Sequence, residues 1–280
     1  MINSNSNKII LITGATDGIG KLTAQLLARQ NLHVIVHGRN EQKVREVVKE
    51  LSEDTQNDNI EGISYDLASL IEVHKMAEDV INRFEKLDVL INNAGAGFAD
   101  PRYSKDGYEL RFAVNYLAPF LLTQLLLPLL RKSAPSRIVN VSSVGQHKLN
   151  FNDIMSEKNF DAFVAYRRSK LALILYTFEL AERLKDEDIT VNALHPGTLL
   201  DTNMVRNAGI APRGEPETGA DAEVYLALSE KLNGITGRYF NVKEESKPDS
   251  QAYDLEARKK LWEMSIILTK LNKEKSNEYT

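Results

Sequence analysis

The chain has 280 residues, of which 42% are hydrophobic and 26% are charged, and its formal net charge is −4. This apolar content can build a sizeable core, and the acidic balance offers no basic footprint for a nucleic acid or an anionic membrane. The absence of cysteine excludes disulfides, thiolate metal sites and cysteine nucleophiles.

The sequence begins MINSNSNKIILITG, which lacks the apolar region of a secretory signal. The most apolar run, LAPFLLTQLLLPLL, is shorter than the roughly 20 residues that cross a bilayer, and Pro119 and Pro128 interrupt it. We therefore expect a soluble, cytoplasmic protein that binds neither membranes nor nucleic acids.

Short β-branched runs alternate with longer amphipathic segments along the chain. The expected strands are residues 8–13, 33–38, 60–65, 87–92, 137–142, 189–194 and 238–242, and helical patterns such as 21–30, 41–53 and 70–86 lie between most of them. This alternation predicts an α/β fold with a doubly wound, seven-stranded parallel sheet covered by helices on both faces. No linker or repeat divides the chain, so one domain over 8–270 is expected, with polar, loosely ordered ends at 1–7 and 271–280.

A glycine-rich turn, TGATDGIGK, directly follows the first expected strand and opens a helix. A helix start of this kind presents free backbone N–H groups to a pyrophosphate, and glycines let the backbone approach it closely. Three glycines in a loop are weak evidence alone, but their position in a strand–turn–helix unit favours a nucleotide site. The residues expected to line it are Gly14, Thr16, Asp17, Gly18, Ile19 and Gly20.

The second expected strand ends in VIVHGRN, with Arg39 at its tip and no carboxylate there. In dinucleotide folds this tip faces the adenosine ribose, where a guanidinium suits a 2′-phosphate. We therefore expect NADP(H) as cofactor, with NAD less favoured; an ordinary surface arginine is the alternative interpretation.

Tyr166 and Lys170 lie four residues apart in AYRRSKLALI, so on a helix their side chains share one face. A nearby ammonium favours phenolate and would lower the tyrosine pKa from about 10 toward the working pH. Because an isolated pair of this kind is usually a solvated helix face, the interpretation depends on the rest of the sequence.

Further motifs follow the later strands in a fixed order. They are Asp66-Leu67, Asn92-Asn93-Ala94-Gly95, Asn115 in the long helical run, Ser142-Ser143, the Tyr166/Lys170 pair and Pro196-Gly197. Together with the glycine turn they resemble the short-chain dehydrogenase/reductase family over roughly residues 8–270. The stretches RIVNVSS, AYRRSKLA, NALHPG and ARKKLWEMS are most similar to its retinol-dehydrogenase-like, NADP-dependent carbonyl reductases. The resemblance implies a Rossmann-type, dinucleotide-binding catalytic domain.

The resemblance also implies catalytic roles. Tyr166 is the acid/base, with Lys170 lowering its pKa and reaching the nicotinamide ribose. Ser143, or alternatively Ser142, would hydrogen-bond the substrate oxygen. Asn115 would keep its helix locally open around a water, which fits Pro119 four residues later, because proline cannot donate a backbone hydrogen bond to residue 115.

The remaining cofactor contacts are implied in the same way, with no metal site. Asp66 and Leu67 would line the adenine, and the other expected residues are Asn93, Ala94, Gly95, Pro196, Gly197 and Thr202. Thr198 is the alternative to Thr202, because the stretch TLLDTNM contains both. Animal retinol dehydrogenases often carry an N-terminal membrane anchor, which this chain is expected to lack.

Two long segments, 144–165 and 198–217, are expected to shape the substrate pocket, and the second to be mobile without ligand. Their apolar residues and the resemblance favour a medium-sized, fairly apolar aldehyde or ketone as substrate. A nucleotide-sensing or scaffold protein without turnover is the alternative function. Relatives often pair through the helices of Asn115 and Tyr166, so a homodimer or homotetramer is implied. Phe112, Tyr116 and Phe120 predict a core or oligomer-facing stripe, and Trp262 is expected to be packed.

Overall fold

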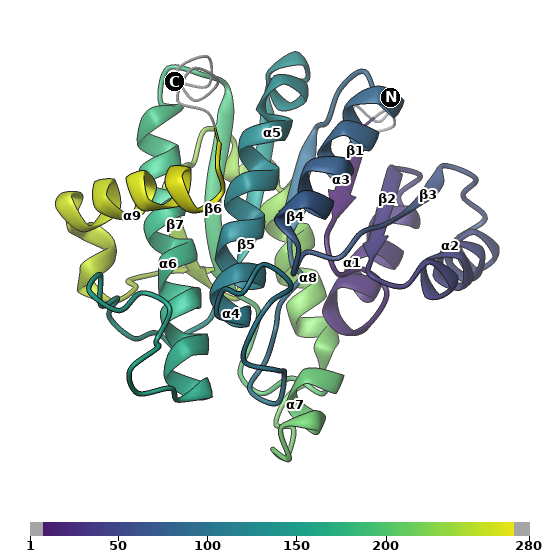
Figure 1. Ribbon diagram of the computed structural model, residues 1–280. Helices are drawn as coiled ribbons and strands as arrows, with labels where there is room; N and C mark the ends of the chain where they lie inside the picture. The colour runs from purple at the N-terminus through teal and green to yellow at the C-terminus, as the bar shows by residue number, and fades with distance from the viewer. Residues whose placement is uncertain (1–7, 272–280) are drawn as a thin grey trace.

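The computed structural model describes residues 8–271 and builds them around a central sheet (Figure 1). In this part of the chain the sheet has eight strands in the order β3-β2-β1-β4-β5-β6-β7-β8, and every pairing is parallel except β7–β8. The strands are β1 Ile9–Ile12, β2 His33–Gly38, β3 Ile60–Ser64, β4 Val89–Asn92, β5 Ser136–Val141, β6 Ile189–His195, β7 Arg238–Asn241 and β8 Glu244–Ser246.

The predicted α/β fold is confirmed, but the prediction of seven strands was one short. β8 is the missing strand, a three-residue antiparallel partner of β7 at the edge of the sheet. Its sequence, EES, has no apolar residue, because none of its side chains is buried and the edge needs none. A strand without apolar alternation gives no sequence signal.

Helices cover both faces of the sheet. One apolar cluster lies between the sheet and the helices α1 Gly18–Ala28, α2 Glu41–Thr55 and α8 Pro216–Leu228. The other lies under α3 Leu70–Arg83, α5 Ala118–Lys132, α6 Ala162–Arg183 and α9 Leu255–Leu268. The shorter elements are α4 Leu110–Phe112, α7 Asn203–Asn207, the π-helical turn η1 Ala113–Leu117, and the 3₁₀ turns η2 Glu230–Leu232 and η3 Ser250–Tyr253.

Successive side chains of the central strands enter opposite clusters. In β1, Ile10 and Ile12 belong to one cluster and Leu11 to the other, and all three are fully buried. A strand that is buried on both faces therefore appears in the sequence as a continuous apolar run such as KIILIT.

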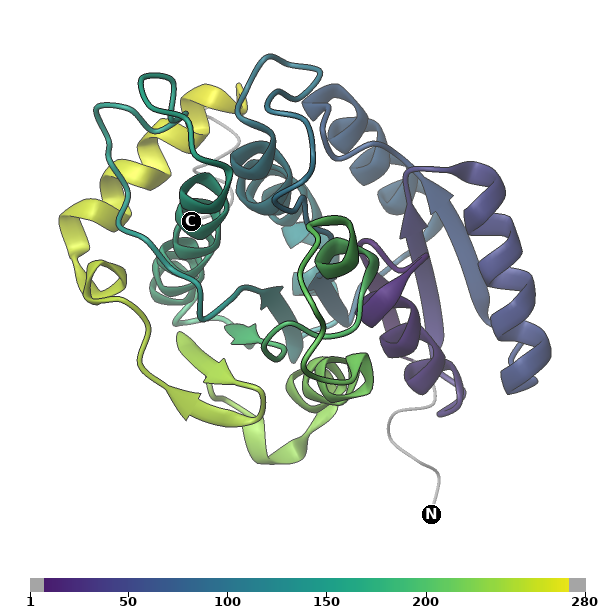
Figure 2. The same cartoon turned by 90° about the horizontal axis from the view of Figure 1, so that it is seen from below.

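β1 pairs with both β2 and β4, and this creates the crevice in which a site can form. Leu11 lies opposite Ile35 on one side and Leu90 on the other. From β1 the chain continues outward to β2 and β3, then returns to the other side of β1 as β4. In sheets of this kind ligands bind outside the carboxyl ends of the strands where the order reverses. Figure 1 shows α7 and the loop before α4 on the same lower side of the molecule, and Figure 2 looks onto that side.

One helical segment, Leu110–Lys132, is long and apolar enough by length and composition to cross a membrane. The expectation that no such segment exists was therefore wrong on that criterion, because α4, η1 and α5 form one continuous helix despite Pro119 and Pro128. Within this fold 83% of its most apolar window is buried. The segment packs against α3 and α6, so it has the surroundings of a core helix.

The stripe of aromatic residues on the long helix lies in the core, which was one of the two positions predicted for it. Phe112, Tyr116 and Phe120 are all buried, and Trp262 of α9 packs edge-on against Phe120 with their ring centroids 5.2 Å apart. Trp262 also stacks on Tyr176 of α6. These contacts dock the last helix onto the middle of the domain.

The predicted loose ends at 1–7 and 271–280 lie outside the described residues, with the exception of Leu271. Its side chain is 4% exposed and its backbone N–H donates to the Ile266 carbonyl. Leu271 therefore still belongs to the packed domain, one residue beyond the boundary at 270 that the sequence predicted.

We expect Trp262→Ala to lower the free energy of unfolding by about 3–5 kcal/mol, because it leaves a cavity beside Phe120 and Tyr176. Urea unfolding followed by circular dichroism measures the loss. Ile267→Ala on the same helix is the control, since that side chain is 72% exposed. An equal loss in both variants would contradict the role given to Trp262 in docking α9.

Candidate active site

The glycine turn after β1 has a backbone that tolerates almost no side chain. Gly14 has φ +67°, and a Cβ placed on it would lie 2.8 Å from the Cα of Ala94. A Cβ on Gly20 would lie 2.4 Å from Nδ2 of Asn93 and 2.5 Å from the Gly14 carbonyl oxygen. Both contacts are closer than atoms can approach, so glycine is required here for the turn to pack on the loop after β4.

Four hydrogen bonds join the glycine turn to the loop after β4. The Thr13 hydroxyl accepts from the backbone N–H groups of Asn93 (3.0 Å) and Ala94 (3.1 Å). In return the Asn93 side chain donates to the carbonyls of Thr13 (2.8 Å) and Gly14 (3.1 Å). Asn93 therefore fixes the glycine turn through its side chain, a contact that the resemblance did not imply.

The start of α1 keeps its backbone donors available. Asp17 caps the helix by accepting from the Gly18 N–H (2.8 Å), and the next N–H to bond back to this turn is that of Lys21. The first N–H groups of a helix have no partner within it, and they favour an anion. Together with the glycines, this arrangement fits the pyrophosphate of a dinucleotide.

His37, at the end of β2, supports the same turn. Its Nδ1 accepts from the Gly14 N–H (3.2 Å), so Nε2 carries the proton that is donated to the Tyr65 carbonyl (3.0 Å). Burial lowers the pKa of His37 to about 4. The sequence analysis missed this residue, because the only signal was its position just before Gly38-Arg39.

At the tip of β2, Arg39 is exposed, and its charge is one of those that lower the pKa of Asp66. The Asp66 carboxylate already accepts from the Ala68 N–H (3.0 Å) and pairs with Lys105 (2.9 Å). Burial raises the pKa of Asp66 while these partners lower it, and the net shift is downward. Leu67 beside it is buried.

Tyr166 and Lys170 share one face of α6, as predicted. The Lys170 ammonium lies 5.7 Å from the centroid of the Tyr166 ring and donates to the Val141 carbonyl (2.8 Å). The expected lowering of the tyrosine pKa was wrong for the protein alone. Burial raises the pKa of Tyr166, and a hydrogen bond with Ser143 lowers it by less. Tyr166 is therefore held as a protonated phenol, the form that can give a proton.

The two serines after β5 have different partners. Ser143 is the one that hydrogen-bonds the Tyr166 side chain. Ser142 is buried, and its hydroxyl donates to the backbone carbonyl of Lys170 (2.7 Å). This geometry favours Ser143 over Ser142 as the residue that meets a substrate oxygen.

Asn115 lies in a loosened turn, as Pro119 predicted. Residues 113–117 form a π-helix, closed by a hydrogen bond from the Ala118 N–H to the Ala113 carbonyl. The Asn115 side chain exchanges two hydrogen bonds with the backbone of Ala96 and donates to Ser169 (2.9 Å). It therefore joins the loop after β4 to the turn of α6 that carries Tyr166 and Lys170.

The segment after β6 crosses from the glycine turn to the loop after β4. Pro196 and Gly197 follow β6 directly, and the Thr202 methyl lies 3.4 Å from where a Cβ on Gly18 would be. Asn203 hydrogen-bonds Asp17. Thr198 instead contacts His195 Nε2 (3.1 Å), so the geometry favours Thr202 as the threonine that faces the cofactor site.

Comparison with known proteins shows the family to which this chain belongs. The family model for short chain dehydrogenases matches residues 8–212. Retinol dehydrogenase 13 of Mus musculus is 37% identical over 94% of this chain and 84% of its own, and polyprenol dehydrogenase of Homo sapiens is 35% identical over 94% and 85%. The Pseudomonas aeruginosa RhlG/NADP active-site complex is 28% identical, covers 84% of this chain and 94% of its own, and has a TM-score of 0.69. The chain belongs to the short-chain dehydrogenase/reductase family.

Within this family the chain is retinol-dehydrogenase-like, and the family is one of oxidoreductases that bind a nicotinamide cofactor. A bound nicotinamide dinucleotide would be held by the glycine turn, by the loop of Asn93, Ala94 and Gly95, and by Lys170. The open backbone at Gly95, flanked by Asn115 Oδ1 (3.4 Å from a Cβ there) and Lys170 Nζ (3.7 Å), fits that role.

Two further buried, ionisable side chains interact electrostatically with Lys170, and the sequence did not indicate either of them. Glu223 of α8 is fully buried and accepts from the Thr23 hydroxyl (2.8 Å); burial raises its pKa to about 8. His195 ends β6, and burial together with the charge of Lys170 lowers its pKa to about 4. Spacing gave no signal for Glu223, which lies in the apolar stretch AEVYLAL of α8.

We expect stability to fall as the pH drops from 6.5 toward 4, because the unfolded chain binds protons that buried His37 excludes. The folded-state pKa of about 4 against 6.5 corresponds to a loss of up to about 3 kcal/mol from this residue. Urea unfolding at pH 7 and 4.5 measures it. The difference should shrink in His37→Gln and stay unchanged in the exposed control His147→Gln. A His37→Gln variant with the wild-type pH dependence would contradict the assignment.

Proposed function

We propose that this short-chain dehydrogenase/reductase transfers hydride between NADP(H) and the carbonyl or alcohol carbon of a medium-sized, fairly apolar substrate. The observation that supports it most is the meeting of Tyr166, Ser143 and Lys170 beside the glycine turn, with Asn115 bridging to α6. These residues come from separate elements and meet at the carboxyl edge of the sheet.

The protein's own residues handle the proton. A bound NADPH supplies the hydride when a carbonyl is reduced. Tyr166 gives its phenolic proton to the carbonyl oxygen as negative charge develops there. Ser143, which already hydrogen-bonds the phenol, donates to the same oxygen and stabilises that charge. In alcohol oxidation the same groups act in reverse.

Lys170 places a positive charge near the phenolate that Tyr166 becomes when it gives up its proton. Its ammonium faces the Tyr166 ring and is held by the Val141 carbonyl, so it stabilises phenolate once the proton has left. Burial lowers the pKa of Lys170 to about 8, while Glu223 raises it. A pKa near the working pH lets Lys170 also pass a proton back toward Tyr166.

The cofactor preference rests on the tip of β2. No hydrogen bond or ion pair within residues 8–271 engages the Arg39 side chain, which leaves its guanidinium available for a 2′-phosphate. Lys43, in the first turn of α2, adds a second cation, which pairs with Asp17 (3.6 Å). The NADP complex of the Pseudomonas aeruginosa relative supports the same choice.

The proposed substrate class is inferred from the apolar side chains that surround the site. Phe98, Phe163 and Met204 lie around Tyr166 and Gly97, and Phe163 and Val144 are 45% and 49% exposed. An apolar surface of this kind suits an aldehyde, ketone or alcohol with a hydrocarbon body. Retinol and polyprenol, which name two of the relatives, are apolar alcohols.

We expect Tyr166→Phe to lower the rate of NADPH oxidation at least about 100-fold, because it removes the proton donor. A panel of aldehydes and ketones followed by NADPH absorbance measures the rate, and NADPH fluorescence measures binding, which should be unchanged. Tyr176→Phe is the matched control, since that hydroxyl lies on the same helix but bonds Gln124 in the core (3.1 Å). If wild type binds NADPH tightly but no carbonyl is reduced, the nucleotide-sensing alternative replaces this proposal.

We expect Arg39→Ala to weaken NADPH binding about tenfold to 100-fold and to leave NADH binding unchanged, because a charge-assisted hydrogen bond to the 2′-phosphate is lost. Fluorescence titration with both nucleotides measures this. Arg45→Ala is the control, since Arg45 is also exposed and pairs with Glu41 on the surface of α2. Equal weakening of NADPH and NADH by Arg39→Ala would contradict a 2′-phosphate contact.

A further inference from the structure

Arg111, at the start of the long helix, is a charged side chain with 1% of its surface exposed. Its guanidinium donates to the backbone carbonyls of Gly97 (3.0 Å), Phe98 (3.2 Å), Asp100 (2.5 Å) and Pro101 (2.8 Å). The fifth bond goes to the carboxylate of buried Glu109 (3.0 Å). All five N–H donors of the side chain are therefore used.

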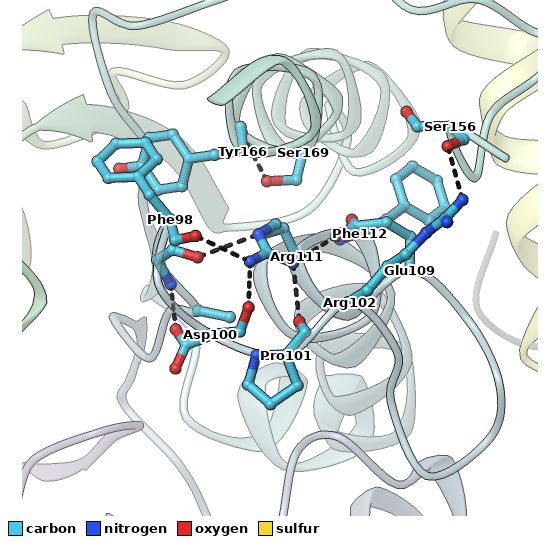
Figure 3. A network of polar contacts seen from close by, with 12 residues as sticks. Phe98, Asp100, Pro101, Arg102, Glu109, Arg111, Phe112, Ser156, Tyr166 and Ser169 are labelled. Carbon is cyan, nitrogen blue, oxygen red and sulfur yellow. Dashed lines mark hydrogen bonds and ion pairs between the residues drawn. The ribbon is translucent and has the colours of Figure 1, made fainter. Parts of the chain in front are cut away.

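A short internal hydrogen bond also closes the loop that Arg111 holds. Asp100 accepts from the Gly97 N–H, and the carbonyls of Gly97, Phe98, Asp100 and Pro101 bind the guanidinium (Figure 3). Glu109 is fixed in turn by accepting from the Phe112 N–H (2.8 Å) at the start of α4. The Arg111 side chain thus holds this part of the loop, and Asn115 holds the backbone of Ala96 just before it.

This loop carries Phe98 directly onto the tyrosine of the site. The Phe98 ring packs edge-on against Tyr166, with centroids 4.6 Å apart, and stacks on Phe163 of the same helix at 4.3 Å. Figure 3 shows Phe98 and Tyr166 together on one side of Arg111, with the carbonyls of the loop between them and the guanidinium. The backbone carbonyl of Phe98 is itself one of the groups that Arg111 binds.

We propose that Arg111 is a positioning residue for Tyr166, and that it acts by holding Phe98 as the apolar wall that orients the phenol and shields it from water. An aromatic pair in this geometry fixes the ring more firmly than apolar contact alone. Burial is also the larger cause of the raised pKa of Tyr166, and the Phe98 ring packs directly against that side chain. The inference rests on the proposed role of Tyr166 as proton donor.

Lysine could not replace the arginine here. An ammonium has three donors and no planar fork, so Arg111→Lys keeps the charge beside Glu109 but leaves at least two of the loop carbonyls without a donor. The loop would loosen and water would reach the phenol, which moves the Tyr166 pKa down toward its ordinary value. Because carbonyl reduction needs the protonated phenol, activity would then be lost at a lower pH.

The test compares Arg111→Lys, Phe98→Ala and the double variant. We expect each single variant to lower kcat for carbonyl reduction between about threefold and tenfold, the rate equivalent of one aromatic pair. NADPH binding should be unchanged, the basic limb of the pH profile should move to lower pH in both, and the double variant should be no worse than either single one. Multiplicative losses in the double variant, or unchanged profiles in both singles, would overturn the proposal.

A second readout does not depend on turnover. Protein labelled with ¹³C at tyrosine Cζ, with Tyr166→Phe to assign the signal, reports the phenol titration directly by NMR. A lower titration midpoint in Phe98→Ala and Arg111→Lys supports the proposal even if no substrate is found, so a failure of the proposed reaction is recognised separately. If Arg111→Lys does not fold, Phe98→Ala decides: an unchanged midpoint overturns the proposal.

Arg137→Lys is the matched control. This guanidinium also binds backbone carbonyls, those of Leu226 (3.0 Å) and Ser229 (2.8 Å), but at the beginning of β5, the opposite end of the strand from Ser143. It should lower stability without moving the titration of Tyr166. A shift equal to that of Arg111→Lys would show a general effect of loosening the fold, and it would overturn the specific role of Arg111.

Discussion

The parallel pairing of β1 with β4 is the constraint on which the site depends. It brings two loops, one from each half of the sheet, to the same edge, where Thr13 and Asn93 exchange hydrogen bonds. Once these loops are joined, the glycines of the first have no room for side chains, and the second continues into the segment that Asn115 and Arg111 hold. The glycine turn and the loop that contacts Tyr166 are thus built on one junction.

Two electrostatic effects act in opposite directions on the ionisable side chains of the site. Removal from water favours the neutral forms of Tyr166, Lys170 and Glu223, whereas the opposite charges of Lys170 and Glu223 favour the charged forms of these two. Lys170 and Glu223, each with a pKa of about 8, therefore lie close to their titration near neutral pH, whereas Tyr166 stays a protonated phenol. Small changes in water access at Tyr166 move this balance, which is why the apolar residues around the phenol matter as much as its polar neighbours.

Much of this arrangement could be predicted from the sequence, because apolar runs and glycine turns report local requirements. The parallel sheet with helices on both faces followed from the alternation of strand and helix patterns, and the shared helix face of Tyr166 and Lys170 from their spacing. Residues whose role depends on contacts far along the chain gave no such signal: His37 meets Gly14, and Arg111 binds a loop that precedes it. The direction of the Tyr166 pKa was also missed, since spacing shows a neighbouring charge but not the extent of burial.

The π-helical turn at 113–117 has a consequence for how the chain can change in length. It contains one residue more than an α-helix would need to cover the same rise, so all of α5 is rotated about its axis relative to an uninterrupted helix, by about 100°. A one-residue deletion or insertion in a surface loop alters only the loop. The same event between Ala113 and Leu117 would turn the buried face of α5 away from the sheet and remove Asn115 from the loop it holds, so this short stretch should retain its length wherever the site is retained.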